Sequence, residues 1–273
     1  MKLSVLKNAN SGTITYYVGD NIEHVSHLKD CTLICKKGFI PKLDGVKFIH
    51  TEDPQLYFYK LSNKIESNYT FNQTFEKGEN TEIHSSCMIG DGVIIGNNVS
   101  IGPNTVIYSK TIIHDNVRID SNCTIGTEGM MWVWENNKKV FLKQLGGVII
   151  KENCVIGSNS VIVRGSANEN TILNNDVNLA PGCLIGHGCQ IGKYSHFANG
   201  VILGGSSHIG DYNFLGSGSI ISAGVKIRVE NVIIGAGSTV IHEIEDEGVY
   251  VGTPAKKIKE SLDKLSGVPK WRK

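Results

Sequence analysis

Large apolar residues recur at every sixth position through most of the chain, usually followed by a small or turn-forming residue, as in Ile89-Gly90. The period is neither the 3.6 of a helix nor the 2 of a simple strand, so it predicts a short strand and a turn repeated many times. The repeat comprises Ile83, Ile89, Ile95, Ile101, Ile107, Ile113, Ile119 and Ile125, then Ile150, Ile156 and Ile162, then Leu173, Leu179, Ile185, Ile191, Phe197, Leu203, Ile209, Leu215, Ile221 and Ile227, and after a slip of one residue Ile234 and Val240.

Three such units close a triangular coil, and coils stacked at the spacing of paired strands, about 4.8 Å, form a parallel β-helix. The position four residues after each large residue is nearly always small or β-branched, as a narrow interior requires. Five of the seven cysteines occupy this position: Cys87, Cys123, Cys154, Cys183 and Cys189. Because buried free cysteine behaves as a small hydrophobe, we expect core packing here and neither disulfides nor zinc.

Three regions follow from this pattern. Residues 1–78 lack the repeat and predict a small α/β domain that binds a nucleotide, with a helix starting at Asp53-Pro54. Residues 79–244 predict an all-β main domain, the β-helix, interrupted by a loop at 127–147. Residues 245–273 predict a C-terminal helical cap, because Thr253 and Pro254 precede apolar Ile258, Leu262 and Leu265 at helical spacing.

The interrupting loop contains Met130, Met131, Trp132 and Trp134, which the core of the β-helix does not explain. Large apolar groups outside a core usually mark an interface. We therefore expect the loop to contact another subunit or to form a wall of the substrate site. A local apolar cluster without ligand contact is the alternative.

Charge and composition remove some classes of function. The 273 residues include 27 Lys+Arg and 26 Asp+Glu, so the net charge of +1 gives no electrostatic reason to expect nucleic-acid binding. No run approaches the roughly 18 apolar residues of a membrane span, and the apolar stretch at the N-terminus is too short for a signal peptide. We expect a cytoplasmic protein that does not bind membranes.

His187 is the candidate for chemistry, because it comes two residues after inward Ile185 and so lies at a coil corner, outside the core. The same corner holds Gly205 and then Ala223 in the following coils, which predicts a groove for an extended ligand. His196 is expected on the adjoining face. The spacing alone leaves open that His187 is a solvated corner residue. The spacing of His187, His196 and His208 also leaves open that two of these histidines meet by chance, as ligands of a zinc ion would. We expect no metal.

The units Ile89-Gly-Asp-Gly-Val, Ile95-Gly-Asn-Asn-Val and Ile101-Gly-Pro-Asn-Thr resemble the hexapeptide-repeat acyltransferases, over about residues 83 to 258. This resemblance implies a left-handed β-helix and homotrimers with sites between subunits. Periodicity does not show the hand of the helix or the symmetry.

Two subfamilies are similar to different parts of the chain. Gln144-Leu-Gly-Gly and Val163-Arg-Gly resemble the lipid A enzymes that acylate UDP-3-O-acylglucosamine, whereas Gly186-His-Gly-Cys and Val251-Gly-Thr-Pro-Ala-Lys256 resemble CoA-dependent acetyltransferases of nucleotide-linked amino sugars. Both place their catalytic base at the position of His187, and the second has a histidine at the position of His196, near the thioester.

The chain departs from both patterns. Ala180 and Pro181 replace an Asp-Asn pair of the lipid A enzymes, and Val163 replaces their aspartate. Gly188 replaces an acidic residue that follows the base in many CoA-dependent members. Another group must therefore orient the imidazole of His187.

The resemblance implies an N-acyltransferase of bacterial glycan synthesis that moves an acyl group from acyl-CoA to a nucleotide-linked amino sugar. We expect a dTDP-4-amino-4,6-dideoxy sugar, as in the anthrose pathway. His187 is the expected base. The expected donor contacts are His196, Gly205 through its N–H, Ala223, Arg228 and Lys256, and the expected substrate contacts are Tyr57, Met130 and Trp132. Acyl-carrier-protein-dependent N-acylation of a UDP-linked amino sugar, O-acylation, and a non-catalytic scaffold or γ-class carbonic anhydrase are the alternatives.

Overall fold

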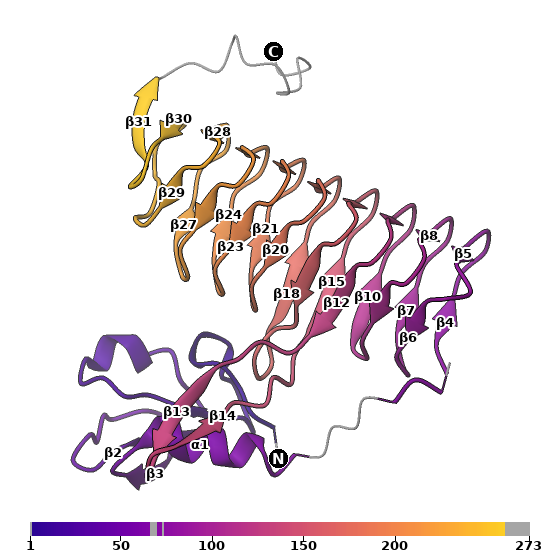
Figure 1. The fold of residues 1–273 in the computed structure, drawn as a ribbon. Helices are drawn as coiled ribbons and strands as arrows, with labels where there is room; N and C mark the ends of the chain where they lie inside the picture. Colours follow the sequence, from indigo (N-terminus) through magenta and orange to yellow (C-terminus); the bar gives the residue numbers. More distant parts are fainter. Residues whose placement is uncertain (1, 66–69, 73, 260–273) are drawn as a thin grey trace. The chain divides into compact units, whose positions relative to one another are not determined.

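The chain folds into two compact units, which Figure 1 shows. The computed structural model describes residues 2–65, 70–72 and 74–259. The N-terminal unit comprises Met1–Asn68, Glu128–Gly146 and Gly165–Glu169, and the solenoid comprises Tyr69–Thr127, Gly147–Arg164 and Asn170–Lys273.

A small parallel sheet and one α-helix form the basis of the N-terminal unit, which confirms the predicted α/β fold of this region. The sheet has the order β1 (Ile14–Tyr16), β2 (Thr32–Lys36), β3 (Lys47–Thr51), and two short 3-10 helices, η1 (Leu6–Asn8) and η2 (Ile22–Val25), accompany it. Helix α1 (Pro54–Ser62) begins at the predicted proline, and the Asp53 carboxylate caps it by accepting a hydrogen bond from the Leu56 N–H at 2.9 Å.

The segment expected to be a loop at 127–147 forms an antiparallel hairpin, β13 (Trp132–Glu135) with β14 (Lys138–Phe141). One hairpin face contributes Val133 and Val140 to the apolar core of the N-terminal unit, beside Phe58 of α1. The hairpin therefore belongs to the N-terminal unit and not to the β-helix domain in which we expected it.

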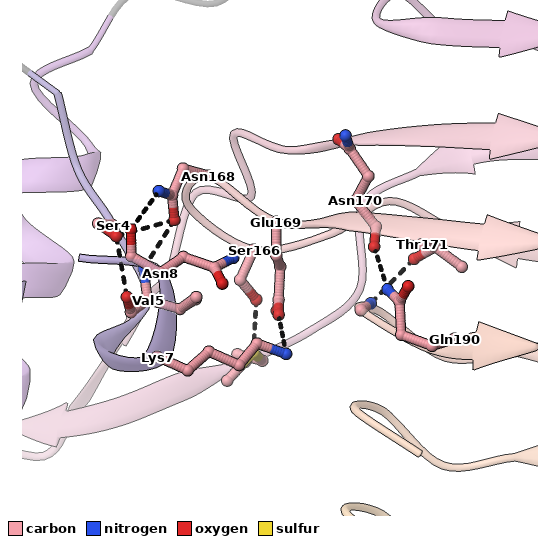
Figure 2. A network of polar contacts seen from close by, with 12 residues as sticks. Ser4, Val5, Lys7, Asn8, Ser166, Asn168, Glu169, Asn170, Thr171 and Gln190 are labelled. Carbon is pink, nitrogen blue, oxygen red and sulfur yellow. Dashed lines mark hydrogen bonds and ion pairs between the residues drawn. The ribbon is translucent and has the colours of Figure 1, made fainter. Parts of the chain in front are cut away.

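The short segment Gly165–Glu169 also joins the N-terminal unit through polar contacts (Figure 2). The Asn168 side-chain oxygen accepts hydrogen bonds from the Ser4 hydroxyl and the Val5 N–H, both at 3.0 Å. The buried Glu169 carboxylate forms an ion pair with Lys7 at 3.1 Å. A buried carboxylate needs such a partner to remain charged.

The solenoid is a stack of coils whose strands form three sheets, parallel except at β31, and the chain passes through these sheets in turn (Figure 1). The first sheet contains β4 (Glu76–Lys77), β7 (Ile94–Ile95), β10 (Thr111–Ile113), β15 (Gly147–Ile150), β18 (Asn170–Leu173), β21 (Gln190–Ile191), β24 (His208–Ile209) and β27 (Lys226–Ile227). The second contains β5 (Glu82–Ile83), β8 (Ser100–Ile101), β11 (Arg118–Ile119), β16 (Val155–Ile156), β19 (Asn178–Leu179), β22 (His196–Phe197), β25 (Phe214–Leu215), β28 (Val232–Ile234), β30 (Gly248–Val251) and β31 (Lys256–Lys259). The third contains β6 (Met88–Ile89), β9 (Val106–Ile107), β12 (Thr124–Thr127), β17 (Val161–Val163), β20 (Leu184–Ile185), β23 (Ile202–Leu203), β26 (Ile220–Ile221) and β29 (Thr239–Val240).

The six-residue repeat places its large residues inside the coils, as predicted. Ile107, Ile156 and Phe197 are fully buried in one continuous core. Four of the five repeat cysteines are fully buried with them, and Cys87 is half-buried. Burial raises the pKa of Cys154 to about 12 and that of Cys183 to about 11, because the interior disfavours a thiolate. These cysteines are core packers, as their spacing predicts.

Asparagines occupy left-handed backbone positions at one coil corner. Asn98, Asn116 and Asn153 have φ values of 55°, 60° and 61°. The Asn98 amide donates to the Asn116 side-chain oxygen and the Asn116 amide to that of Asn153, each at 3.2 Å. Asparagine tolerates this conformation better than other L-residues, so the ladder stabilises the turns of successive coils.

Strand pairing continues across two excursions of the chain. Partners in adjacent coils are usually 18 residues apart, as for Leu184 and Ile202. Thr111 instead pairs with Val148, 37 residues on, and Val161 pairs with Leu184, 23 residues on. The surplus of 19 and 5 residues corresponds to 128–146 and 165–169, which belong to the N-terminal unit.

The solenoid is longer than the predicted boundaries of 79–244. It begins with β4, which pairs with β7, and continues through β30 in the second sheet. The predicted helix start is wrong, because Lys256–Lys259 form β31, antiparallel to β30. Leu262 and Leu265 of that prediction lie outside the described residues. In the part of the chain that the structure describes, no helix has the length and apolarity to cross a membrane.

Candidate functional site

His187 lies at the corner between β20 and β21, where the third sheet passes into the first. Gly205 follows β23 and Ala223 follows β26, so both occupy this corner in the next two coils. The structure therefore places His187, Gly205 and Ala223 in the column that their spacing predicts.

The imidazole of His187 lies where a side chain of residue 205 would otherwise be. A Cβ atom built on Gly205 would lie 2.3 Å from His187 Nε2 and 2.6 Å from Cδ2, both far inside van der Waals contact. The ring fills this space, so the predicted groove is not open at the level of Gly205. Glycine at position 205 serves to seat the ring.

The peptide group that joins His187 to Gly188 is held at both of its ends. The His187 carbonyl accepts a hydrogen bond from the Ser206 N–H of the next coil at 2.6 Å. The Gly188 N–H donates to the hydroxyl oxygen of Thr171 at 2.9 Å. Thr171 is fully buried, and its hydroxyl donates in turn to the Val163 carbonyl at 2.6 Å.

Gly205 also provides a backbone donor at this corner. Its carbonyl accepts from the Gly224 N–H at 2.8 Å, which continues the ladder between coils. Among the described residues, the Gly205 N–H donates no hydrogen bond. A backbone donor beside an imidazole is the pair that acyl transfer uses, the imidazole accepting a proton and the N–H binding an oxyanion.

Arg164 holds the position equivalent to His187 in the preceding coil, since Ile162 pairs with Ile185. Its guanidinium is almost completely buried, and Nε donates to the Gly126 carbonyl at 2.6 Å. Nη2 donates to the Ser109 carbonyl at 2.8 Å. Arg164 thus fastens the corners of two earlier coils, a role that sequence reasoning did not assign to it.

His196 lies in β22 of the second sheet, which is not one of the two sheets that meet at His187. The expectation that it lies on a face adjoining His187 is therefore wrong for a single chain. Its ring stacks on Phe214, with centroids 5.5 Å apart and planes 3° apart. Burial lowers the pKa of His196, because the packed surroundings disfavour the charged ring.

The two cations expected to bind donor phosphates lie away from the corner of His187. Arg228 follows β27, between the first and second sheets, and its Nε forms an ion pair with Glu243 at 3.1 Å. Lys256 is exposed at the start of β31 in the second sheet. Arg228 is therefore already paired with a carboxylate, and Lys256 remains a predicted phosphate contact.

The predicted substrate contacts belong to the N-terminal unit. Tyr57 is exposed on α1, and Met130 is the most exposed large apolar residue described, at 84 %. The outer face of the hairpin carries Trp132, with the Lys139 ammonium 4.4 Å from its ring centroid. This ammonium covers one face of the indole, so Trp132 offers less open surface for stacking than its sequence context indicates.

Among the described residues, no group of three or more His, Cys, Asp or Glu side chains could hold a metal ion. The three histidines considered above are separated, because His208 is in the first sheet and His196 in the second, while His187 lies at a corner.

Comparison with known proteins gives two matches to repeat families. Residues 78–109 match the family described as bacterial transferase hexapeptide (six repeats). Residues 147–166 match the hexapeptide repeat of succinyl-transferase.

Similar sequences carry the name UDP-3-O-acylglucosamine N-acyltransferase. The protein of that name from Xylella fastidiosa (strain 9a5c) is 45% identical over 131 residues, which are 48% of this chain and 38% of that protein. The one from Delftia acidovorans is 31% identical over 128 residues, 47% of this chain and 38% of that protein. The match thus spans well under half the length of these relatives.

A solved structure has the same fold. The UDP-N-acetylglucosamine acyltransferase from Campylobacter jejuni superposes with a TM-score of 0.60 at 23% identity, covering 68% of this chain and 71% of that one. The predicted left-handed parallel β-helix is confirmed. With repeats matched over residues 78–109 and 147–166 and coils stacked as their period requires, this chain is similar to the hexapeptide-repeat transferases.

Proposed function

We propose that the protein is an N-acyltransferase that moves an acyl group from a thioester to the amine of a nucleotide-linked amino sugar. The observation that carries this proposal is the corner of His187, where a seated imidazole and the Gly205 N–H lie in adjacent coils. The names of the sequence relatives support an amine acceptor on a UDP-linked sugar. A dTDP-linked 4-amino sugar, the acceptor expected from the sequence, is the competing substrate.

The residues of this corner suit each stage of the transfer. The amine nitrogen attacks the thioester carbonyl, and His187 Nε2 accepts the proton that the nitrogen loses. A neutral imidazole is able to do so because its ordinary pKa is near 6.5. The Gly205 N–H stabilises the oxyanion of the tetrahedral intermediate. The carbon–sulfur bond then breaks, and the protonated imidazole returns its proton to the departing thiolate.

The complete site is proposed to form between subunits of a homotrimer. Within one chain, His196 lies on the sheet that does not border the corner of His187. A site that uses both histidines must therefore combine two copies of the chain. The exposed Phe141 and Trp134 of the hairpin, at 46 % and 57 %, offer apolar surface to a neighbouring subunit.

Thiol release from acyl-CoA, followed with and without amino sugars, tests this function. UDP- and dTDP-linked amino sugars are compared with their hydroxyl analogues, and an acyl-carrier-protein thioester replaces acyl-CoA in a parallel series. We expect release that requires an amino sugar and that falls about 10²- to 10⁴-fold in His187→Gln.

His84→Gln is the matched control, because His84 is an exposed histidine next to a strand of an early coil. It should retain full activity. Release from neither thioester with any acceptor, or an unchanged rate in His187→Gln, contradicts the proposal. Release with hydroxyl analogues alone replaces it with O-acylation.

A further inference from the structure

We infer that Thr171 is a positioning residue for His187. It takes the role that an acidic residue next to the base fills in many of the CoA-dependent acetyltransferases that the chain resembles. This inference rests on the proposed function for its kinetic readout, but not for its spectroscopic one. A positioning residue is needed because Gly188, which follows His187, has no side chain that orients the imidazole.

The hydroxyl of Thr171 bridges two backbone segments that the excursion at 165–169 separates in sequence. It donates to the Val163 carbonyl, at the end of β17, and accepts from the Gly188 N–H, at the corner of His187. The two distances, 2.6 Å and 2.9 Å, are those of well-formed hydrogen bonds. Because Thr171 is fully buried, water cannot replace either contact.

The strand that carries Thr171 is itself held on both sides, and Figure 2 shows the contact to Gln190 on one of them. The Asn170 side-chain oxygen accepts from the Gly147 N–H at 2.8 Å, and the Asn170 carbonyl accepts from the Gln190 side-chain amide at 2.8 Å. Asn170 and Thr171 together therefore tie the strand to the coil before it and to the coil after it. The hydroxyl has little freedom to move, which makes it a rigid support for the corner.

The bond from Thr171 matters for the imidazole because Gly188 is the next residue after His187. Gly188 has a φ of 66°, a left-handed conformation that leaves the corner dependent on its hydrogen bonds. With the His187 carbonyl held by the Ser206 N–H, the Thr171 bond completes the restraint of the connecting peptide. A fixed peptide fixes the direction of the side chain, and Gly205 provides the space in which the ring lies.

The chain itself provides a control for the structural part of this bridge. Thr105 lies at the same place in its six-residue unit, two residues before inward Ile107, but on another side of its coil. Its hydroxyl donates to the Asp120 carbonyl at 2.9 Å and accepts from the Cys123 N–H at 3.2 Å. It is also fully buried. Thr105→Val removes the same two kinds of hydrogen bond as Thr171→Val, but far along the chain from His187.

The test compares Thr171→Val, Thr171→Ser and Thr105→Val in the full-length protein. We expect Thr171→Val to lower kcat about 10- to 100-fold with KM changed less than about threefold, since a base misplaced by up to 1 Å costs about that much. Thr171→Ser, which keeps the hydroxyl, restores kcat. Thr105→Val lowers the unfolding temperature as much as Thr171→Val does, with kcat unchanged.

Nitrogen NMR of labelled histidines gives a readout without catalysis. The His187 ring signals, identified by their loss in His187→Gln, should shift in Thr171→Val and stay in place in Thr105→Val. If the wild type proves inactive, the proposed function fails, yet these spectra still decide the positioning role. Equal kinetic loss in the two valine variants, no rescue by serine, or His187 signals unmoved in Thr171→Val overturns the inference.

Discussion

Replacing Gly205 by alanine tests directly whether the His187 ring is seated on this glycine. The new Cβ atom would meet His187 Nε2 at 2.3 Å, whereas ordinary contact begins near 3.4 Å, so the ring must move by about 1 Å. Gly205 does not adopt a left-handed φ, and its backbone therefore accepts alanine. A displacement of about 1 Å in a catalytic group costs about 100-fold in rate, or about 2.7 kcal/mol in the activation barrier.

The assay is amino-sugar-dependent thiol release, measured as kcat and KM beside the free energy of unfolding in urea. We expect Gly205→Ala to lower kcat about 100-fold, Gly205→Ser to lower it at least as much, and both to unfold within about 1 kcal/mol of the wild type, since the side chain is added at a coil surface. Wild-type kcat in Gly205→Ala would refute the seating of the ring. An equal loss of stability and activity would show that the coil, and not the imidazole, had been disturbed.

Three further outcomes test the fold and its electrostatics. Burial lowers the pKa of His196, so the unfolded chain binds the proton more readily and the free energy of unfolding should fall as the pH drops through about 6.5. Urea unfolding at pH 7.5 and at pH 5.5 measures this fall, which should be smaller in His196→Gln than in the wild type. An equal fall in both proteins would contradict the assignment to His196. The thiols of Cys154 and Cys183, with pKa values near 12 and 11, should resist a thiol reagent at pH 8 in the native protein and react once it is unfolded in urea; rapid native labelling of either, located by peptide mapping, would show that the core opens. Asn116→Ala should lower the free energy of unfolding by about 1–2 kcal/mol, because alanine is less suited to the left-handed φ of this position. Asn116→Gly should lower it by less, and denaturant titration of both variants measures the two losses. Equal losses would assign the effect to the lost amide hydrogen bonds instead.

The core of the solenoid was predictable because each residue's surroundings depend on its place in a local repeat. Ile107 and Phe197 are buried for the same reason that every sixth residue is, and neighbouring coils only repeat the arrangement. The corner column of His187, Gly205 and Ala223 followed from the same counting. No long-range information is needed while the period holds.

Counting along the six-residue repeat assigned His196 to the wrong sheet. His196 is nine residues after His187, which takes the chain past one complete side of the triangle and onto the second sheet. The position is regular within the repeat, but the prediction assigned it one side too early. The extra residue near Arg228 has a similar local effect, since Phe214 pairs with Ile233 at an interval of 19.

In the C-terminal segment, strand pairing outweighs the local sequence signals for a helix. Thr253 and Pro254 are typical of a helix start, yet Lys256–Lys259 pair with β30. A strand at the end of a sheet leaves unpaired N–H and C=O groups, and the following segment satisfies them on one side. The sequence predicted a cap at the C-terminal end of the β-helix, but a helical one, whereas residues 256–259 form a strand.

The amino-acid sequence by itself determined the β-helix, its buried cysteines and the placement of His187 at a corner, because these depend on the period of the apolar residues. Tertiary structure alone decided that the Trp132 hairpin and residues 165–169 join the N-terminal unit, that the His187 ring occupies the space above Gly205, and that Thr171 holds the next peptide. These features arise from contacts between residues far apart in the chain. A hydrogen bond, or the space left by a missing Cβ atom, depends on which residues lie close together in space. The six-residue repeat does not encode those distances.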